Sequence, residues 1–287
     1  MSSPSLSVVI AAWNGRATIG EQLDALSREQ VPGGFEVVVA DNGSTDDTAD
    51  VVRSYADRLD VTVVDASARQ GQTFARNTGV RASRAPYLVL LDQDDVIAPG
   101  YLATMLSGLQ EHPLVGAMMS KELLNNEWVA KSRQLNQGVG LNYYNGVPWI
   151  YGCSMGIRRE TFDLLGGFNE SLDRAAEDVE LCWRAAKLGI TPTLLENAVL
   201  EYRFPTTLKG LFRQGRVYGR GSVAVDSLYR HEVAVSRSVY RWARSMVEAL
   251  YLVVVGGDNG RRGAGAFLLG RRLGKLEGSI RHRFVDL

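Results

Sequence analysis

Three carboxylates stand within four positions directly after an apolar run. The run covers residues 87–91, and Asp92, Asp94 and Asp95 follow it, with Gln93 among them. A continuous apolar run bounded by turn signals is typical of a buried parallel strand, and ligands bind beyond the carboxyl ends of such strands. Clustered carboxylate oxygens favour a hard divalent cation, Mg2+ or Mn2+. The cluster therefore predicts a metal held against a phosphorylated substrate, and a solvated acidic turn is the alternative.

A second carboxylate, Asp41, ends another apolar run at residues 35–40. If both runs are parallel strands, Asp41 and Asp92 reach the same rim from adjacent strand ends, where an aspartate can accept hydrogen bonds from ribose or a base edge. Residues 41–44 also have good turn chemistry, so capping of that turn is the alternative. The sequence contains no Gly-x-Gly-x-x-Gly after its first strand and no Walker-type loop, which argues against a dinucleotide-binding protein or a kinase.

Arg76 falls about one turn into a helix predicted for residues 73–82. A guanidinium there would supply counter-charge to a diphosphate or to the carboxylates. An arginine exposed on the helix surface is the alternative.

An acidic pair, Glu177 and Asp178, opens the helix predicted for residues 178–188. The helix dipole favours carboxylates at this end, which alone would explain the pair. The functional alternative is a general base, because a carboxylate that accepts a proton makes a sugar or alcohol hydroxyl a better nucleophile. The preceding turn carries Gly167 and Phe168, whose ring suits the lining of a pocket beside that base.

Alternating strands and helices are expected to position these side chains. Hydrophobic periodicity predicts, in order, strand 6–12, helix 18–30, strand 35–40, helix 48–57, strand 61–64, helix 73–82 and strand 87–91. This order makes an α/β fold with a doubly wound, mostly parallel sheet flanked by helices the expected fold class. After it we predict helix 101–111, strand 114–120, an irregular segment at 121–148, strand 150–158, helices 159–165 and 178–188, and helical structure beyond residue 204. The irregular segment is either a substrate-binding insertion or a packed loop.

The 287 residues suffice for one large α/β domain or two small ones, and we divide them into a sheet domain at 1–205 and a basic helical segment at 206–287. Residues 201–287 hold half of the basic side chains. Such a segment could lie against phosphates or an anionic membrane, although a solvated basic face is the commoner explanation. Two cysteines without metal-type spacing predict a reduced, cytoplasmic setting. No nucleic-acid partner is expected.

Six elements in this order resemble the inverting glycosyltransferases of family 2, which have the nucleotide-sugar-binding GT-A fold. The resemblance covers roughly residues 5–205. Its elements are Ser7–Ile10 with Trp13-Asn14, Asp41–Asp46, Gly71–Gly79 with Arg76-Asn77, Leu91–Asp95, Gly166-Gly167-Phe168, and Glu177-Asp178 with Leu181 and Arg184. The resemblance implies transfer of one sugar from a UDP-, dTDP- or GDP-sugar to a small-molecule, glycan or lipid-linked acceptor.

The resemblance also implies roles for individual residues. Asp41 would contact the nucleobase and Asp92 the ribose side, while Asp94 or Asp95 would hold the Mn2+ or Mg2+ that bridges the diphosphate. Asp178 would be the base, with Glu177 orienting or binding the acceptor. Further donor contacts would come from Ala11, Trp13, Gly71, Arg76 and Gln93, and acceptor contacts from Gly167, Phe168 and Trp149.

The sequence departs from the family pattern at three places. Ala11-Ala12 stands where Pro-Thr or Pro-Ser is frequent and Arg69 where Asn is common, which puts the donor preference in doubt. Processive members carry Gln-x-x-Arg-Trp, and the nearest match here, residues 213–218, has Val217 instead of Trp. This favours a single-sugar transferase over a polymer synthase.

The C-terminal segment leaves its partners open. Its residues Gln214, Arg216 and Arg220 could close over the diphosphate or form a surface basic helix. Alternating basic and apolar residues near 241–244 and 271–276 suit a peripheral position at the inner face of a membrane, and packing on the catalytic domain or in a homodimer explains them as well.

Two other functions remain open from the sequence. A nucleotidyltransferase would place similar carboxylates on a metal, but its Gly-rich loop after the first strand is replaced here by residues 12–16 with a lone Gly15. A non-catalytic nucleotide- or glycan-binding module on the same fold is the third hypothesis.

Overall fold

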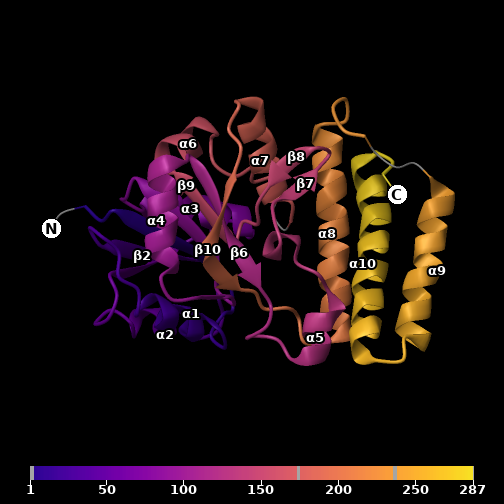
Figure 1. Cartoon of the computed structure of the whole chain (residues 1–287), viewed down its shortest axis with the longest axis horizontal. Coiled ribbons are helices and arrows are strands. Elements are labelled where there is room, and N and C mark those ends of the chain that lie inside the picture. Colours follow the sequence, from indigo (N-terminus) through magenta and orange to yellow (C-terminus); the bar gives the residue numbers. More distant parts are fainter. Residues whose placement is uncertain (1–2, 173–174, 235–237, 287) are drawn as a thin grey trace. The chain divides into compact units, whose positions relative to one another are not determined.

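The computed structural model describes residues 3–172, 175–234 and 238–286 (Figure 1). They fall into two compact units. The first comprises residues 3–120, 136–172 and 177–202, and the second comprises residues 121–135, 175–176, 203–234 and 238–286. Across these described residues, no helix has both the length and the apolar character needed to cross a bilayer.

An eight-stranded sheet forms the centre of the first unit, in the order β3-β2-β1-β4-β9-β6-β10-β5. Its strands are β1 (Leu6–Ala12), β2 (Phe35–Asp41), β3 (Val61–Asp65), β4 (Tyr87–Asp92), β5 (Val96–Ile97), β6 (Leu114–Ser120), β9 (Ser154–Arg158) and β10 (Thr193–Glu201). The first four strands pair in parallel, as do β6 and β10. The predicted α/β fold with a mostly parallel sheet and flanking helices is confirmed, although β9 runs antiparallel to both of its neighbours.

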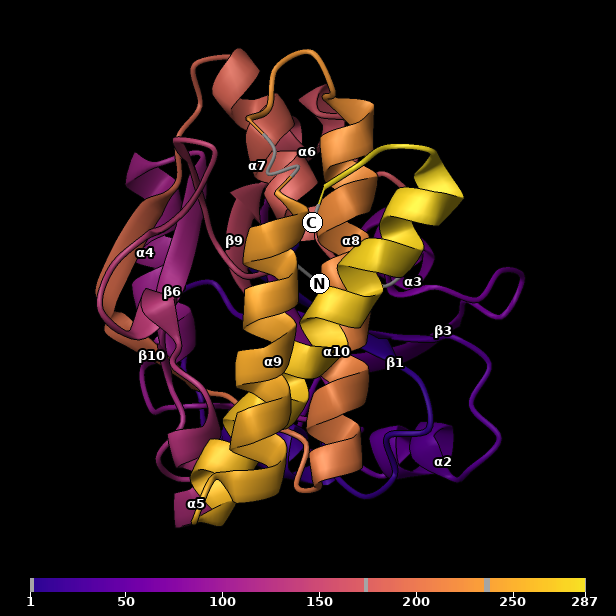
Figure 2. The same cartoon turned by 90° about the vertical axis from the view of Figure 1, so that its right-hand side faces the viewer.

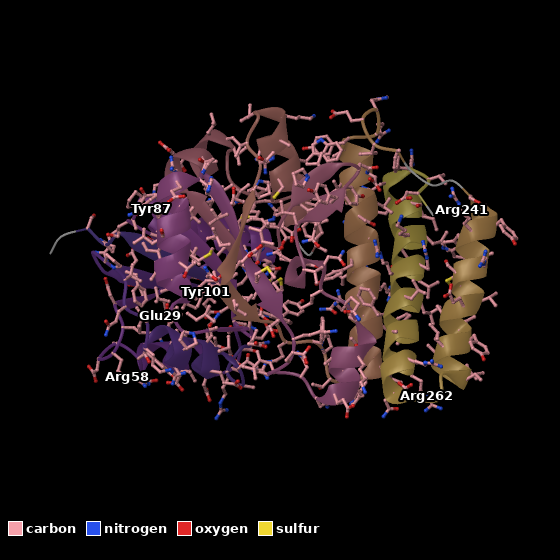
Figure 3. All side chains as sticks on the ribbon, viewed as in Figure 1. Glu29, Arg58, Tyr87, Tyr101, Arg241 and Arg262 are labelled. Atoms are coloured by element: carbon pink, nitrogen blue, oxygen red, sulfur yellow. The ribbon has the colours of Figure 1, made fainter. Side chains whose placement is uncertain are left out.

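Helices flank this sheet within the first unit (Figure 1). They are α1 (Ile19–Leu26), α2 (Thr48–Arg53), α3 (Gln72–Ala82), α4 (Tyr101–Glu111), α6 (Arg159–Leu164) and α7 (Glu177–Lys187). The core between sheet and helices contains fully buried Leu90 of β4, Ile157 of β9 and Leu181 of α7. Glu29, labelled in Figure 3, caps α4 by accepting hydrogen bonds from the N–H groups of Gly100 and Leu102, both at 2.8 Å. A short 3-10 helix, η1 (Asn136–Gly138), and the hairpin of β7 (Asn142–Tyr144) and β8 (Val147–Trp149) complete the unit.

Two sequence predictions of the fold need correction, and one strand was not predicted. Asp41 and Asp92 do not end adjacent strands, because β1 lies between β2 and β4, with Ala12 opposite Asp41 and Ala11 opposite Asp92. The strand predicted for residues 150–158 begins only at Ser154. β10 was not predicted, because its register shifts between Leu195 and Val199 and thereby interrupts the alternation that marks a strand.

The second unit is helical, as predicted for the C-terminal segment. It contains α5 (Glu127–Ser132), α8 (Leu208–Leu228), α9 (Val239–Val255) and α10 (Asn259–His282). α10 lies between α8 and α9, and Figure 2 shows the α9 and α10 ribbons side by side. α5 formed within the segment that the sequence analysis expected to be irregular, and the Asn126 side chain caps it by accepting the Val129 N–H.

Candidate active site

Arg76 joins the two acidic regions that the sequence singled out. It lies in α3 with 1 % of its side chain exposed. Its Nη2 donates to Asp92 Oδ1 and its Nη1 to Glu177 Oε1, both at 2.7 Å, and its guanidinium carbon lies 5.5 Å from the centroid of the Phe168 ring. Burial alone would lower the pKa of Arg76, but the charges of Asp92 and Glu177 outweigh it and raise that pKa. Arg76 is therefore a buried, permanently charged bridge and not a surface arginine.

Asp178, next to Glu177 at the start of α7, has a different environment. Its carboxylate accepts hydrogen bonds from the backbone N–H groups of Gly152 at 3.1 Å and Val179 at 2.8 Å. Burial raises the pKa of Asp178 to about 7, the charge of Glu177 adds to this, and the two N–H groups and Arg76 oppose it. Such a carboxylate can accept a proton near neutral pH.

The approach of Gly152 to Arg76 leaves no room for a side chain at that position. A Cβ on Gly152 would lie 2.7 Å from Arg76 Nη1. A side chain at residue 152 would therefore shift either the N–H group that holds Asp178 or the guanidinium that holds Glu177.

The turn after β4 groups acidic side chains with a thiol. Ligand atoms of Asp92, Asp95 and Cys153 all lie within 4.8 Å of one another. Asp95 is 1 % exposed, whereas Asp94 is half-buried and lies outside this group. Burial raises the pKa of Cys153 well above its usual range, and the charges of Asp95 and Asp92 raise it further. The Cys153 side chain is therefore a neutral thiol at neutral pH. The carboxylates of Asp92 and Asp95 thus fit a hard cation, and the Cys153 thiol is a poorer ligand for such an ion.

Gln93, inside the same turn, ties it to the loop after β1. The Trp13 N–H donates to Gln93 Oε1 at 2.9 Å, and Gln93 Nε2 donates to the Trp13 carbonyl at 3.1 Å. A Cβ on Gly15 would lie 2.1 Å from Gln93 Oε1, so this approach requires glycine. Trp13 itself is 56 % exposed, and Ala11 is half-buried beside Asp92 in the sheet register. Ala11, Trp13 and Gln93, which are predicted to contact the donor, therefore lie at the same end of the sheet.

Asp41 and Gly71 lie at the ends of the neighbouring elements. Asp41 Oδ1 accepts the Ser44 N–H at 2.9 Å, so the side chain does cap its turn while remaining half-buried at the rim. Gly71 precedes α3, and its N–H donates to Asn42 Oδ1 at 2.8 Å. Asn42 therefore fixes the loop that leads to Arg76.

On the acceptor side, the structure buries two of the three predicted residues. Phe168 is 2 % exposed and packs edge-on against Phe162, with ring centroids 5.8 Å apart, so little of its ring is left for an acceptor. The Gly167 carbonyl accepts a hydrogen bond from Arg184 Nη2 at 2.8 Å. Trp149 is half-buried and packs against the core cluster that contains Phe168. The acceptor roles of Phe168, Gly167 and Trp149 remain predictions.

The predicted diphosphate contacts lie in the second unit, on α8. Arg216 forms an ion pair with Glu277 of α10 at 2.7 Å, and Arg220 approaches the same carboxylate at 3.8 Å. Gln214 accepts a hydrogen bond from Arg133 Nη1 at 2.5 Å. All three side chains take part in contacts within their own unit, and their role towards a diphosphate remains a prediction.

Sequence reasoning missed two residues that complete the site. Gln72 Nε2 donates to Asp92 Oδ1 at 2.8 Å, and Gly152 donates to Asp178. Gln72 stands beside the predicted Gly71, and that position was its only signal. Gly152 precedes β9, which pairs antiparallel with β4. No local sequence pattern predicts this pairing.

Solved structures similar to this chain show its fold. A mannosyltransferase from Pyrobaculum calidifontis, in complex with GDP-Man and Mn2+, superposes with a TM-score of 0.68 at 20% identity, over 96% of this chain and 88% of that one. Residues 1–349 of TarS from S. aureus, in complex with UDP-GlcNAc, give 0.56 at 16% identity, over 98% and 92%. These likenesses show the fold, which is the GT-A fold of glycosyltransferases.

The sequence comparisons then identify the family. The model of glycosyl transferase family 2 matches residues 7–166, and that of glycosyl transferase family group 2 matches residues 87–256. This chain belongs to glycosyl transferase family 2, an inverting family, as the resemblance implied. Validoxylamine A glucosyltransferase from Streptomyces hygroscopicus subsp. limoneus is 31% identical over 228 residues, which are 67% of this chain and 50% of that protein. The chain thus spans about half the length of such curated relatives.

Proposed function

We propose that this protein transfers one sugar from a nucleoside-diphosphate sugar to an acceptor hydroxyl with inversion, and that Asp178 is the general base. The observation that carries the proposal is the Arg76 bridge. It joins Asp92, at the rim where the strands end, to Glu177, which precedes Asp178. One buried side chain thereby links the carboxylate proposed to bind the donor to the residue that precedes the proposed base, within one unit.

The chemistry needs few groups from the protein. The acceptor oxygen forms a bond to the anomeric carbon, the bond from that carbon to the diphosphate oxygen breaks, and the acceptor proton passes to Asp178. One direct displacement inverts the anomeric centre, so no covalent intermediate with the protein is required. A base with a pKa of about 7 is half ionised near neutral pH and can both accept this proton and release it afterwards.

The remaining residues bind and orient. Asp92 is fixed by Arg76 and Gln72 at 2.7 and 2.8 Å, in the position proposed for the ribose side of the donor. Asp41 at the end of β2 would meet the nucleobase. Glu177, held by Arg76, would orient the acceptor beside Asp178, and Trp149 would line its path.

Asp94 or Asp95 would hold a divalent cation, Mn2+ or Mg2+, beside Asp92. When bound, such an ion neutralises the charge that develops on the leaving diphosphate. Asp95 lies beside Asp92 but is buried, whereas Asp94 lies outside that group and is half-buried, so an ion that arrives with the donor can reach Asp94 first.

The comparisons support a nucleotide-sugar donor without naming it. Solved relatives of the same fold carry GDP-Man with Mn2+ in one case and UDP-GlcNAc in another. Family membership favours a glycosyltransferase over the nucleotidyltransferase alternative. Val217, in place of the tryptophan of processive members, supports transfer of a single sugar. The acceptor class remains open among small molecules, glycans and lipid-linked sugars.

The test separates binding from transfer. Thermal stabilisation by UDP-, GDP- and dTDP-sugars with and without Mn2+ selects the donor, and release of nucleoside diphosphate then reports turnover. Asp178→Asn should keep the stabilisation by the donor and lose turnover by about a thousandfold, within the range of general-base catalysis. Asp163→Asn, at an exposed aspartate of α6, is the matched control and should turn over like wild type.

A stability measurement checks the environment of Asp178 independently. Because its folded pKa is raised above the unfolded value, the protonated form stabilises the fold, and this stability is lost as pH rises through about 7. Asp178→Asn should therefore melt at a higher temperature than wild type at pH 8, with the difference shrinking towards pH 4. Retained turnover in the variant would move the base elsewhere, and no turnover of any donor by wild type would favour a non-catalytic module.

A further inference from the structure

The helix α9 has apolar side chains on two sides, and α10 covers one of them. The buried residues of α9 are Ser245 and Ala249, one turn apart. A Cβ on Gly265 of α10 would lie 2.8 Å from the Ala249 carbonyl oxygen, so the two backbones meet closely along this stripe. Trp242 Nε1 adds a hydrogen bond to the Arg272 carbonyl at 3.3 Å. The contact with α10 is therefore narrow, and much of the helix surface lies outside it.

The opposite side of α9 is apolar and exposed. Tyr240, Val247, Tyr251 and Val254 are 75%, 67%, 61% and 69% exposed, at spacings of seven, four and three residues that place them on one face. Val239 and Leu250 flank this face with exposures of 63% and 47%. We call these six residues the outer face of α9. A contiguous exposed apolar face of this kind marks an interaction site.

Basic side chains lie on one flank of the outer face and beyond one end of it. Arg241 and Arg244 are exposed on the adjoining flank of α9, and Arg261 and Arg262 are exposed at the start of α10, just beyond the end of α9. Figure 3 labels Arg241 and Arg262 near opposite ends of this helix pair. Apolar and aromatic residues beside arginines are typical of helices that lie in the headgroup region of an anionic bilayer.

The charge selects this occupant over a second copy of the chain. Two copies would each bring the same positive flank, whereas anionic lipid phosphates are complementary to it. α9 has 17 residues and carries Arg241, Arg244 and Glu248, so it suits a position in the plane of the surface. We propose that the outer face of α9 rests on an anionic membrane surface, with its apolar side chains among the acyl chains and its arginines at the phosphates. This proposal does not depend on the donor or on the base.

Vesicle co-sedimentation of the full chain tests the proposal. Wild type should bind vesicles of equimolar phosphatidylcholine and phosphatidylglycerol and should not bind pure phosphatidylcholine vesicles. Val247→Glu with Tyr251→Glu should weaken binding at least tenfold, and Arg241→Gln with Arg244→Gln about fivefold per arginine. Leu188→Glu, at an exposed leucine of the first unit, is the matched control and should bind like wild type. All substituted positions are exposed, and an unchanged circular dichroism melt verifies folding.

A site-specific probe reports the orientation. Cys153 and Cys182 are buried, so a cysteine at position 251 can be labelled selectively with a polarity-sensitive fluorophore. Emission from Tyr251→Cys should shift to the blue on anionic vesicles, and emission from Leu188→Cys should not. The proposal is overturned if wild type ignores anionic vesicles, or if the Val247→Glu, Tyr251→Glu protein binds them equally well. It is also overturned if wild type is a dimer that these substitutions dissociate without any vesicle binding.

Discussion

The two carboxylates proposed for binding and for proton transfer have contrasting surroundings, and Arg76 connects the first of them to the neighbour of the second. Asp92, at the end of β4, accepts charged and neutral side-chain donors, Arg76 at 2.7 Å and Gln72 at 2.8 Å. Asp178, at the start of α7, accepts hydrogen bonds from backbone N–H groups. Its neighbour Glu177 accepts a hydrogen bond from Nη1 of Arg76.

The different environments of Asp92 and Asp178 suit these two aspartates to different roles. An ion pair fixes Asp92 in place, which suits a binding contact. Burial and an adjacent charge raise the pKa of Asp178 to about 7, which suits a group that must take up a proton and release it. Arg76 holds both Asp92 and Glu177, so its replacement should impair donor binding and turnover together.

Arg76→Met should have the largest effect on this division. It would leave Asp92 and Glu177 without their buried cation, and breaking such a pair costs about 3 kcal/mol of unfolding free energy. Donor stabilisation and turnover should fall together, because both sides lose their anchor. Urea unfolding and thermal shifts measure the two effects. Arg81→Met, at an exposed arginine of the same helix, should change neither, and an unaltered Arg76→Met protein would show that the bridge is dispensable.

The metal assignment should respond to substitutions in the turn after β4. Asp94→Asn should weaken Mn2+-dependent donor stabilisation by at least about tenfold, because even the loss of a group that only supports a metal ligand costs about ten- to a hundredfold. Asp95→Asn should weaken it less and lower the melting temperature more, because Asp95 is 1 % exposed. Thermal shifts across a Mn2+ titration distinguish the two, with exposed Asp57→Asn as control. Equal donor stabilisation in chelator and in Mn2+ would contradict the assignment.

Gly15→Ala should disturb only the binding side. The added Cβ would lie 2.1 Å from Gln93 Oε1 and would displace the side chain that pairs with Trp13. Because displacements of about 1 Å can cost up to a hundredfold, we expect the donor KM to rise about tenfold with a smaller change in kcat. Gly140→Ala meets no atom within 4 Å and serves as control. A change in kcat alone would contradict a role of Gln93 in donor binding.

The sequence predicted the residues of the site better than their arrangement. The carboxylates after β4 and at the start of α7 follow from where an apolar run ends and where a helix begins, which are local patterns. Arg76 was predicted in the right turn of α3, with the carboxylates as one of two expected partners. The structure places it on the carboxylates, and its role towards a diphosphate remains a prediction.

The contacts that sequence reasoning missed depend on strand order. β1 inserts between β2 and β4, so Asp41 and Asp92 share a rim without sharing adjacent strands. β9 runs antiparallel beside β4, which brings Gly152 to Asp178 and Cys153 to Asp92 and Asp95. Long-range pairing of this kind is set by the whole sheet and leaves no periodic signal in the segments themselves.

The most direct test of the account is the pH dependence of kcat/KM for nucleoside diphosphate release. Asp178 must be ionised to accept a proton, and its pKa is raised to about 7, so the rate should fall about tenfold per unit of pH below that value. The same acid limb should be absent from the residual rate of Asp178→Asn. A limb near the usual pKa of an exposed aspartate, or an unchanged limb in the variant, would contradict the assignment of Asp178 as the base.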